Sequence, residues 1–169
     1  KVMVAPGNGG MSDEFEAHDL NIEDNSEIVR LAKAQQVDLV VVGPEVPLCN
    51  GAVDALNEAG ILAYGPDRAG ARLEGSKAYT KDFLNKYGIP TAAYGNFSEI
   101  EPALAYLGKL ALPVVVKASG LAAGKGVLIC QTLEEAEEAV REMLAGESFG
   151  DSGKEVVIEE SVSYTHLTL

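Results

Sequence analysis

Two short apolar segments, each ended by a Gly-Pro pair, flank a helix-like stretch in the first half of the chain. The first segment runs from Asp38 to Val42, the second from Ile61 to Tyr64, and the stretch between them covers about residues 48–58. Continuous apolar strands of this kind are typical of a parallel sheet that is covered on both faces. A strand, a helix and a second strand in this order predict a right-handed βαβ unit.

The same alternation extends toward the N-terminus. Residues 1–4 form a strand-like run that stops at Pro6, and Asp24 is placed to cap a helix over about residues 25–36. We therefore predict an α/β fold that begins with a Rossmann-like parallel-sheet domain over residues 1–73.

The pattern changes near Arg72–Ser76, where we place a domain boundary. Ser76 is placed to cap a helix that ends at Gly88. The apolar face of this helix would carry Tyr79, Phe83, Leu84 and Tyr87. Ser98 and Thr132, each followed three residues later by Glu, predict capping boxes of two further helices. Strands are predicted from the apolar runs at residues 113–117, 126–130 and 155–160.

Composition and charge narrow the classes of function. The chain has 169 residues, 47% of them hydrophobic and 23% charged, which excludes a disordered tail or a collagen-like repeat. No apolar stretch approaches the roughly 18 residues that a membrane span needs. A formal net charge of −13 would repel a nucleic-acid backbone, although a local cluster of lysines could still bind a small phosphorylated ligand.

The two cysteines bear on the cellular compartment. Cys49 and Cys130 lie far apart and in no CxxC or His-rich context, so we expect neither a disulfide framework nor a zinc site. This usage favours a reducing compartment, and no signal or transit peptide is visible. We expect a cytoplasmic protein.

A glycine-rich loop between two predicted strands, from Lys117 to Gly126, is the sharpest local signal. It is not a Walker A loop, because Ser119 stands where the first Gly must be and Gly126 where Ser or Thr must be. It is not a dinucleotide fingerprint either, because a strand rather than a helix follows it. The loop could fold over a triphosphate, or it could be an ordinary hairpin, and spacing alone favours neither. Lys117, however, closes an apolar strand, where a lysine is costly without a partner anion.

Two further places in the second half carry candidate ligand contacts. Lys77 opens a helix and could reach a phosphate, although a solvated lysine is the commoner case. Glu159 and Glu160 end a strand and could accept a hydrogen bond from an adenine amino group. Two exposed acids at the end of a strand are the commoner alternative.

Two loops in the first half follow predicted strands. Gly43, Pro44 and Glu45 lie at the carboxyl end of a parallel strand, where open α/β sheets bind ligands. Gly7 and Asn8 follow the first strand, and glycines in such a turn serve tight geometry as readily as phosphate binding. The sequence therefore does not decide whether these two loops contact a ligand or are ordinary turns.

Five segments, taken in order, resemble a known family. They are Val4–Gly9, Val42–Leu48, Leu73–Leu84, Val116–Val127 and Val157–Glu160. Together they are similar to the phosphoribosylamine–glycine ligases, which are ATP-grasp enzymes of de novo purine biosynthesis. Each segment alone is shared with other ATP-grasp enzymes. The order of the five segments and the amino-acid sequences of the second and third are specific to this family. The resemblance runs from residue 1 to about residue 160.

The resemblance implies an ATP-dependent ligase that joins glycine to 5-phosphoribosylamine. The glycine carboxylate attacks the γ-phosphate of ATP, and the amine of 5-phosphoribosylamine captures the resulting glycyl phosphate. The products are glycinamide ribonucleotide, ADP and phosphate. The implied cofactors are ATP and Mg²⁺, with small-molecule substrates and no nucleic-acid or membrane partner. Such chemistry needs charge neutralisation and exclusion of water more than a protein nucleophile, so no catalytic residue is expected beyond the phosphate-contacting Lys117.

The resemblance also implies roles for individual residues. Lys77 and Lys117 match residues that contact ATP phosphates. The loop over the phosphates matches Ala122, Ala123, Gly124, Lys125, Gly126 and Val127. The stretch that holds adenine matches Glu159, Glu160, Ser161 and Val162. The phosphoribosylamine side matches Gly7, Asn8, Gly43, Pro44 and Glu45.

The chain departs from the family pattern at both ends. The family begins with a strand, a glycine loop and a helix before the position of Lys1, and residues 161–169 do not resemble its continuation after Glu160. We therefore expect a truncated chain: a Rossmann-like domain over 1–73 without those first elements, a partial ATP-grasp domain over 74–160 and a non-family tail over 161–169. The family's magnesium ligands lie in its C-terminal part, so no metal ligand is expected here and the chain itself is expected to be inactive.

Two alternatives to this function stay open. One is another ATP-grasp carboxylate–amine ligase or carboxylase. The other is a non-catalytic nucleotide-binding module, which would bind ATP without glycine-dependent turnover.

Overall fold

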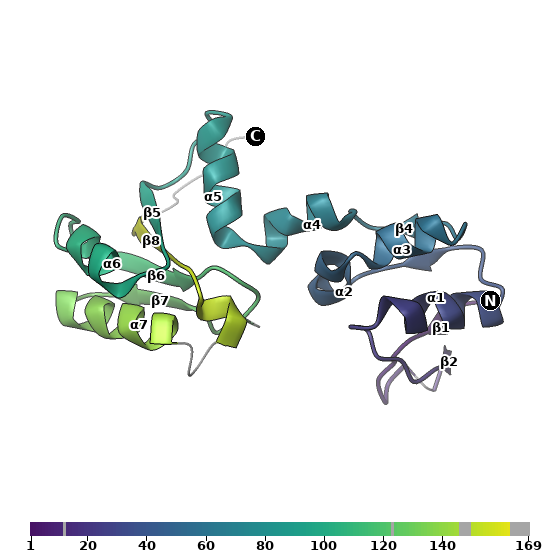
Figure 1. Cartoon of the computed structure of the whole chain (residues 1–169). Coiled ribbons are helices and arrows are strands. Elements are labelled where there is room, and N and C mark those ends of the chain that lie inside the picture. Colours follow the sequence, from purple (N-terminus) through teal and green to yellow (C-terminus); the bar gives the residue numbers. More distant parts are fainter. Residues whose placement is uncertain (12, 123, 146–149, 163–169) are drawn as a thin grey trace. The chain divides into compact units, whose positions relative to one another are not determined.

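The computed structural model describes residues 1–11, 13–122, 124–145 and 150–162. Ala123 and residues 163–169, which make up most of the expected tail, lie outside this set. The chain divides into two compact units, Lys1–Arg72 and Leu73–Leu169. Helix α4 (Arg68–Gly75) spans the division between them (Figure 1). The predicted α/β class is confirmed.

The described part of the first unit combines two parallel strand pairs with three helices that precede α4. Strand β1 (Met3–Val4) pairs with β2 (Glu16–Ala17), and β3 (Val40–Val41) pairs with β4 (Ala63–Tyr64). The helices are α1 (Asn25–Ala34), α2 (Glu45–Asn50) and α3 (Ala52–Glu58). The predicted cap of α1 is confirmed, because the Asp24 carboxylate accepts hydrogen bonds from the backbone N–H of Ser26 at 2.8 Å and of Glu27 at 3.3 Å.

A single helix was predicted where the structure has α2 and α3. Gly51 separates them in the left-handed region, with φ 87°. The carbonyl of Asn50 accepts hydrogen bonds from the Asn25 amide at 2.9 Å and from the Arg68 guanidinium. The chain therefore turns at Gly51, where a left-handed conformation is open to glycine and strained for other residues.

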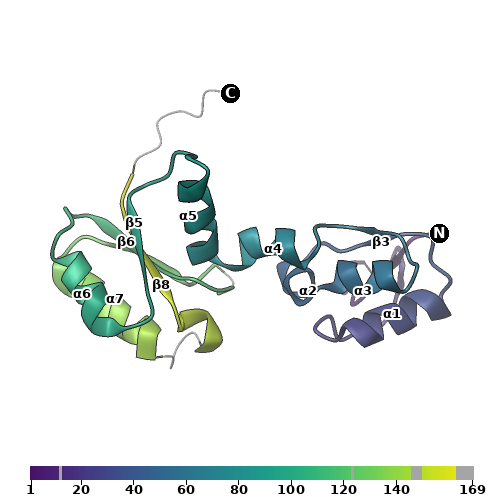
Figure 2. The ribbon, with the colours of Figure 1, turned by 45° about the horizontal axis from the view of Figure 1, so that its top comes forward.

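The expectation that β3 is covered on both faces is wrong for the described chain. Val40 and Ala63 pack against a core formed by α1 and α3, which includes Ile28 and Leu56. The opposite face carries Leu39, Val41, Leu62 and Tyr64, which are between 54% and 71% exposed. The physical reason is that α1 and α3 lie side by side (Figure 2) and bury the same face of the strand pair.

The second unit contains an antiparallel sheet of four strands in the order β5–β8–β6–β7. The strands are β5 (Tyr94–Phe97), β6 (Val114–Ala118), β7 (Val127–Cys130) and β8 (Val156–Glu160). The other elements are α5 (Lys77–Lys86), α6 (Ile100–Leu107), α7 (Leu133–Ala145) and the 3₁₀ turn η1 (Gly150–Gly153). Helices α6 and α7 cover one face of the sheet and α5 lies on the other (Figure 1). The strands predicted near residues 113–117, 126–130 and 155–160 are confirmed.

Of the three helix caps predicted in this unit, two are confirmed and one is wrong. Ser76 caps α5 by accepting a hydrogen bond from the backbone N–H of Tyr79 at 3.2 Å. The Thr132 box is also confirmed, because the Thr132 hydroxyl accepts from the Glu135 N–H at 3.2 Å. The Ser98 box is wrong: Glu99 occupies the N-cap position, with φ −127° and ψ 142°, and no side chain caps α6. Ser98 lies one position too early for its hydroxyl to reach the orphan amides of the first turn.

The predicted apolar face of α5 is only partly buried. Its rings follow one another along the helix, with centroids 6.4 Å apart for Tyr79 and Phe83 and 4.6 Å apart for Phe83 and Tyr87. Ala78 is the fully buried residue of this helix, whereas Tyr87 is exposed. No helix built from the described residues combines the length and the apolar character needed to cross a membrane.

Candidate functional site

Strand register places two charged side chains on the α5 face of the sheet. Val116 and Ile158 belong to the core under α6 and α7. Because side chains alternate along a strand, their neighbours Lys117 and Glu159 point to the opposite face. The β6–β8 register pairs Lys117 with Val157 and Val115 with Glu159, which brings the two charged residues to adjacent positions.

A buried carboxylate lies between two lysines at this place. The Glu159 carboxylate forms one ion pair with Lys117 of β6 and another with Lys81 of α5. The side chain of Glu159 is only 7% exposed, that of Lys81 12% and that of Lys117 25%. Glu159 is therefore the partner anion that the sequence predicted for Lys117.

The two lysines keep this carboxylate ionised. Burial of Glu159 by itself raises the pKa of its carboxyl group, but hydrogen bonds from Lys117 and Lys81 and the charges of both ammonium groups outweigh burial. The net result is a pKa below the ordinary glutamate value. Two ammonium groups against one carboxylate leave the group of three with a net positive charge.

A third lysine joins the base of the glycine-rich loop to the start of α5. The Lys77 ammonium donates to the carbonyl of Gly120 at 2.9 Å. The backbone N–H of Lys77 donates to the Ser119 carbonyl at 2.8 Å, and the N–H of Ala78 donates to the Ser119 hydroxyl at 3.1 Å. Burial, followed by the charge of Lys117, lowers the pKa of Lys77. Lys77 and Lys117 are therefore close enough for their charges to interact. Together they form a positively charged patch in a chain whose net charge is negative.

The glycine-rich loop is anchored at its base and exposed at its tip. The N–H of Gly120 donates to the Ser152 carbonyl at 3.1 Å, and the Ser152 hydroxyl donates to the Leu121 carbonyl at 2.6 Å. Gly124 has φ 78° and is exposed, as is Lys125. A Cβ on Gly126 would lie 2.6 Å from the Cβ of Ala122, so the return of the loop into β7 needs a glycine there.

The predicted adenine stretch begins with the buried Glu159 and continues to Val162. Glu160 is exposed, and its backbone N–H donates to the Ala93 carbonyl at 3.1 Å. The N–H of Ser161 donates to the Pro113 carbonyl at 3.3 Å, and Val162 is 42% exposed. The alternative of two exposed acids is therefore wrong for Glu159 and correct for Glu160.

The residues predicted on the phosphoribosylamine side all belong to the first unit. Gly7 and Asn8 follow β1, and the Asn8 side-chain oxygen accepts a hydrogen bond from the Met11 N–H at 3.1 Å. Gly43 and Pro44 follow β3, and Glu45 is the first residue of α2. These five residues are exposed. They follow strands that belong to two different pairs, whereas Lys77, Lys81 and Lys117 belong to the second unit.

Sequence reasoning missed Lys81 as a member of the site. The available signal was the i, i+4 spacing, which places Lys77 and Lys81 on the same helix face. What could not be read is that Glu159, on a strand far along the chain, lies under that face.

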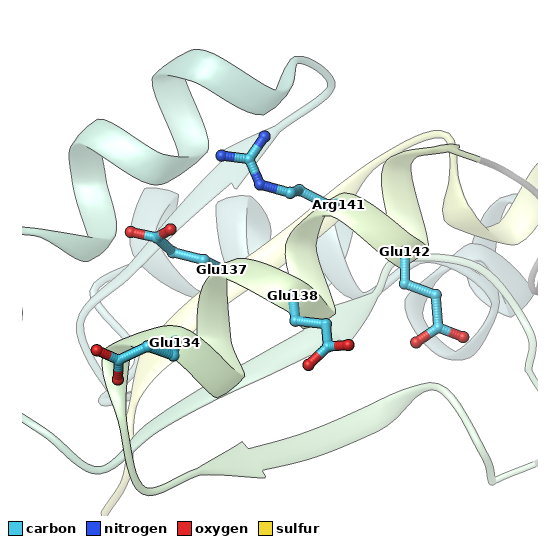
Figure 3. Close-up of a pocket in the computed structure, with 5 residues that line it drawn as sticks. All are labelled: Glu134, Glu137, Glu138, Arg141 and Glu142. Carbon is cyan, nitrogen blue, oxygen red and sulfur yellow. The ribbon is translucent and has the colours of Figure 1, made fainter.

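A hollow on the outer surface of α7 lies apart from these lysines. It is lined by Glu134, Glu137, Glu138, Arg141 and Glu142, whose side chains project from α7 (Figure 3). Four carboxylates and one guanidinium give it a negative charge, which suits no phosphate. Within the described ranges no group of three or more His, Cys, Asp or Glu side chains could hold a metal ion.

The comparisons with known proteins cover both units. A family model described as phosphoribosylglycinamide synthetase, N domain, matches residues 1–74, and that of the ATP-grasp (A) domain of the same family matches residues 75–169. A phosphoribosylamine–glycine ligase of Vibrio vulnificus is 57% identical over 161 residues, which are 94% of this chain and 38% of that protein. The chain thus spans about 38% of the length of this curated relative.

Solved structures agree with these matches. The crystal structure of a phosphoribosylamine–glycine ligase from Thermotoga maritima has a TM-score of 0.75 and 32% identity, covering 95% of this chain and 38% of that one. The biotin carboxylase domain of a Hydrogenobacter thermophilus 2-oxoglutarate carboxylase, solved with MgADP, ADP and bicarbonate, has a TM-score of 0.71 and 25% identity, covering 87% and 34%. Because the two family models together match the whole sequence, the chain belongs to the phosphoribosylglycinamide synthetase family.

Proposed function

We propose that the protein carrying this sequence is an ATP-dependent ligase that joins glycine to 5-phosphoribosylamine through glycyl phosphate. The products are glycinamide ribonucleotide, ADP and phosphate. The observation that carries the proposal is the cluster of Lys77, Lys81 and Lys117 beside an exposed glycine-rich loop, in a chain that the ATP-grasp family matches. In a chain with a net charge of −13, such a local excess of ammonium groups is suited to a polyphosphate.

In this proposal the chain's own residues neutralise charge and exclude water. ATP, when bound, supplies the γ-phosphoryl group that activates the glycine carboxylate. Lys77 and Lys117 hold phosphate oxygens, and the loop residues Ala122–Val127 cover them. Fixed ammonium groups beside a water-poor site stabilise developing charge more than they would in water. Mg²⁺ is a further expected cofactor, but the described residues offer no ligand cluster for it, so we assign it none of them.

The remaining residues have proposed binding roles. Glu159, Glu160, Ser161 and Val162 form the adenine stretch. Gly7, Asn8, Gly43, Pro44 and Glu45 face the phosphoribosylamine. The support for the second set is that each loop follows the carboxyl end of a parallel strand, which is where open α/β sheets bind ligands.

The test is release of ADP by the complete protein that carries this sequence. We expect release only when ATP, glycine and 5-phosphoribosylamine are all present. Lys117→Ala should lower the rate by on the order of a hundredfold, the typical loss when one preorganised charge contact is removed. Lys109→Ala is the matched control, because Lys109 is an exposed lysine of the same unit, and it should leave the rate within about twofold.

Other outcomes would point elsewhere. Glycine-independent ADP release that requires bicarbonate would favour a carboxylase, the activity suggested by the likeness to the Hydrogenobacter domain. ATP binding without turnover under any of these conditions would favour a nucleotide-binding module. Either result refutes the proposed ligase.

A further inference from the structure

The two lysines that pair with Glu159 are held very differently. The Lys81 ammonium also donates to the Thr91 hydroxyl at 2.8 Å and lies 5.5 Å from the centre of the Tyr94 ring. Its side chain is 12% exposed. Lys117 is twice as exposed, at 25%, and its ion-pair partner among the described residues is Glu159. Lys81 is therefore the fixed cation of the group and Lys117 the one that is free to turn.

The arrival of a polyphosphate creates a conflict for Lys117. To bind a phosphate oxygen, its ammonium has to share its charge and its N–H donors between the phosphate and Glu159, which weakens its pairing with the carboxylate. A carboxylate that is 7% exposed cannot replace a lost ion pair with water, and an uncompensated buried charge is strongly unfavourable. The polar side chains of β5 that lie across from β8, Tyr94 and Asn96, do not supply a replacement partner, because both donate hydrogen bonds to the Asp82 carboxylate.

We propose that Lys81 is a positioning residue that keeps Glu159 neutralised, so that Lys117 can move from the carboxylate to the phosphates of the nucleotide. This inference rests on the proposed function, since it takes ATP as the ligand of Lys117. Lys81 itself stays with Glu159, Thr91 and Tyr94 in both states. Its contribution to nucleotide affinity is therefore conditional on the negative charge of Glu159.

The test is a double-mutant cycle on ATP affinity, measured by calorimetry on the complete protein at fixed salt and magnesium. Lys81→Met should raise the Kd for ATP by on the order of thirtyfold, as expected when one partner of a buried charge pair is removed. In a protein that already carries Glu159→Gln, the same Lys81→Met change should raise Kd by less than about threefold, because no buried carboxylate remains to be neutralised. Lys81→Arg keeps the charge and should restore the affinity to within about threefold of the original protein.

The outcomes separate this role from simpler ones. A lysine that contacts the phosphates, or that only adds positive potential, would lose the same affinity in both backgrounds, and that result overturns the inference. Circular dichroism shows whether each variant is folded. If Lys81→Met is not folded, Lys81→Gln replaces it in both backgrounds, because a neutral amide can still hydrogen-bond Thr91 and Glu159. Failure of the original protein to bind ATP would instead overturn the proposed function, and this inference with it.

Discussion

Glu159→Ala should destabilise the second unit by about 3 kcal/mol, which is the low end of the range for breaking a buried ion pair. The substitution leaves the ammonium groups of Lys81 and Lys117 facing the same space with no anion between them. The low end applies because Lys117 is 25% exposed and can turn toward water, whereas Lys81 cannot do so easily. Glu159→Gln should cost less, because the amide keeps the volume and one hydrogen-bond acceptor.

The assay is urea unfolding followed by circular dichroism, with Glu160→Ala as the matched control. Glu160 is the next residue on the same strand and is exposed, so its loss should change the free energy of unfolding by no more than about 0.5 kcal/mol. Equal effects of the two alanine substitutions would refute the reasoning, because they would mean that the pairing of Glu159 contributes no more than an exposed carboxylate.

The pH dependence follows from the lowered pKa of Glu159. A group whose pKa is lower in the folded state binds fewer protons there than in the unfolded state. Its stabilisation is therefore fully present above the ordinary glutamate pKa of about 4.3 and is lost as the pH falls through the lower folded value. The stability difference between the original protein and Glu159→Ala should be constant from pH 6 to about pH 5 and should shrink below about pH 4. A difference that does not change down to pH 3 would contradict an ionised Glu159.

Four further substitutions test the fold around the site by the same unfolding assay. Thr132→Ala should cost about 1 kcal/mol and Ser98→Ala less than about 0.5 kcal/mol, because only the former removes a helix cap, and equal costs would contradict the observed caps. Gly120→Ala should cost about 1–3 kcal/mol, since its Cβ would lie 2.7 Å from the Cα of Ser152, and a neutral effect would mean that η1 does not hold the loop. Met143→Ala should cost about 2–5 kcal/mol, because this side chain is fully buried under the sheet, and a smaller loss would argue against the α6–α7 core.

The parts of the fold that local sequence patterns determine were predictable. Strands β6, β7 and β8 each contain a run of three or four consecutive apolar residues. The caps of α1, α5 and α7 are short side chains at the position where orphan amides need acceptors. Strand β5 was missed because its sequence, Tyr-Gly-Asn-Phe, has no apolar run. Its structure depends instead on pairing with β8 and on the contact of Phe97 with Tyr106, whose ring centres are 5.2 Å apart.

The candidate site was predictable only in part, for a related reason. A lysine at the end of an apolar strand had to have an anion, and that followed from Lys117 and its neighbours alone. Which anion it has depends on the register of β8 against β6, a contact between distant parts of the chain that no local pattern encodes. The role of Lys81 depends in turn on how α5 lies over that strand. The local sequence therefore predicted that Lys117 pairs with an anion. The long-range packing of β6, β8 and α5 determined that this anion is Glu159.

The pairing of Lys117 with Glu159 also reconciles folding with ligand binding. A site for a polyphosphate needs several ammonium groups close together, but without a ligand those groups repel one another and resist burial. One buried carboxylate between Lys81 and Lys117 offsets part of that repulsion, so the lysines can be held in place before any nucleotide arrives. Because the Glu159 carboxylate pairs with both Lys81 and Lys117, this group of three keeps the net positive charge that attracts an anion. Adding a second carboxylate would therefore stabilise the nucleotide-free protein and weaken nucleotide binding. Removing Glu159 would destabilise the nucleotide-free protein, and it would strengthen nucleotide binding only if the protein still folds.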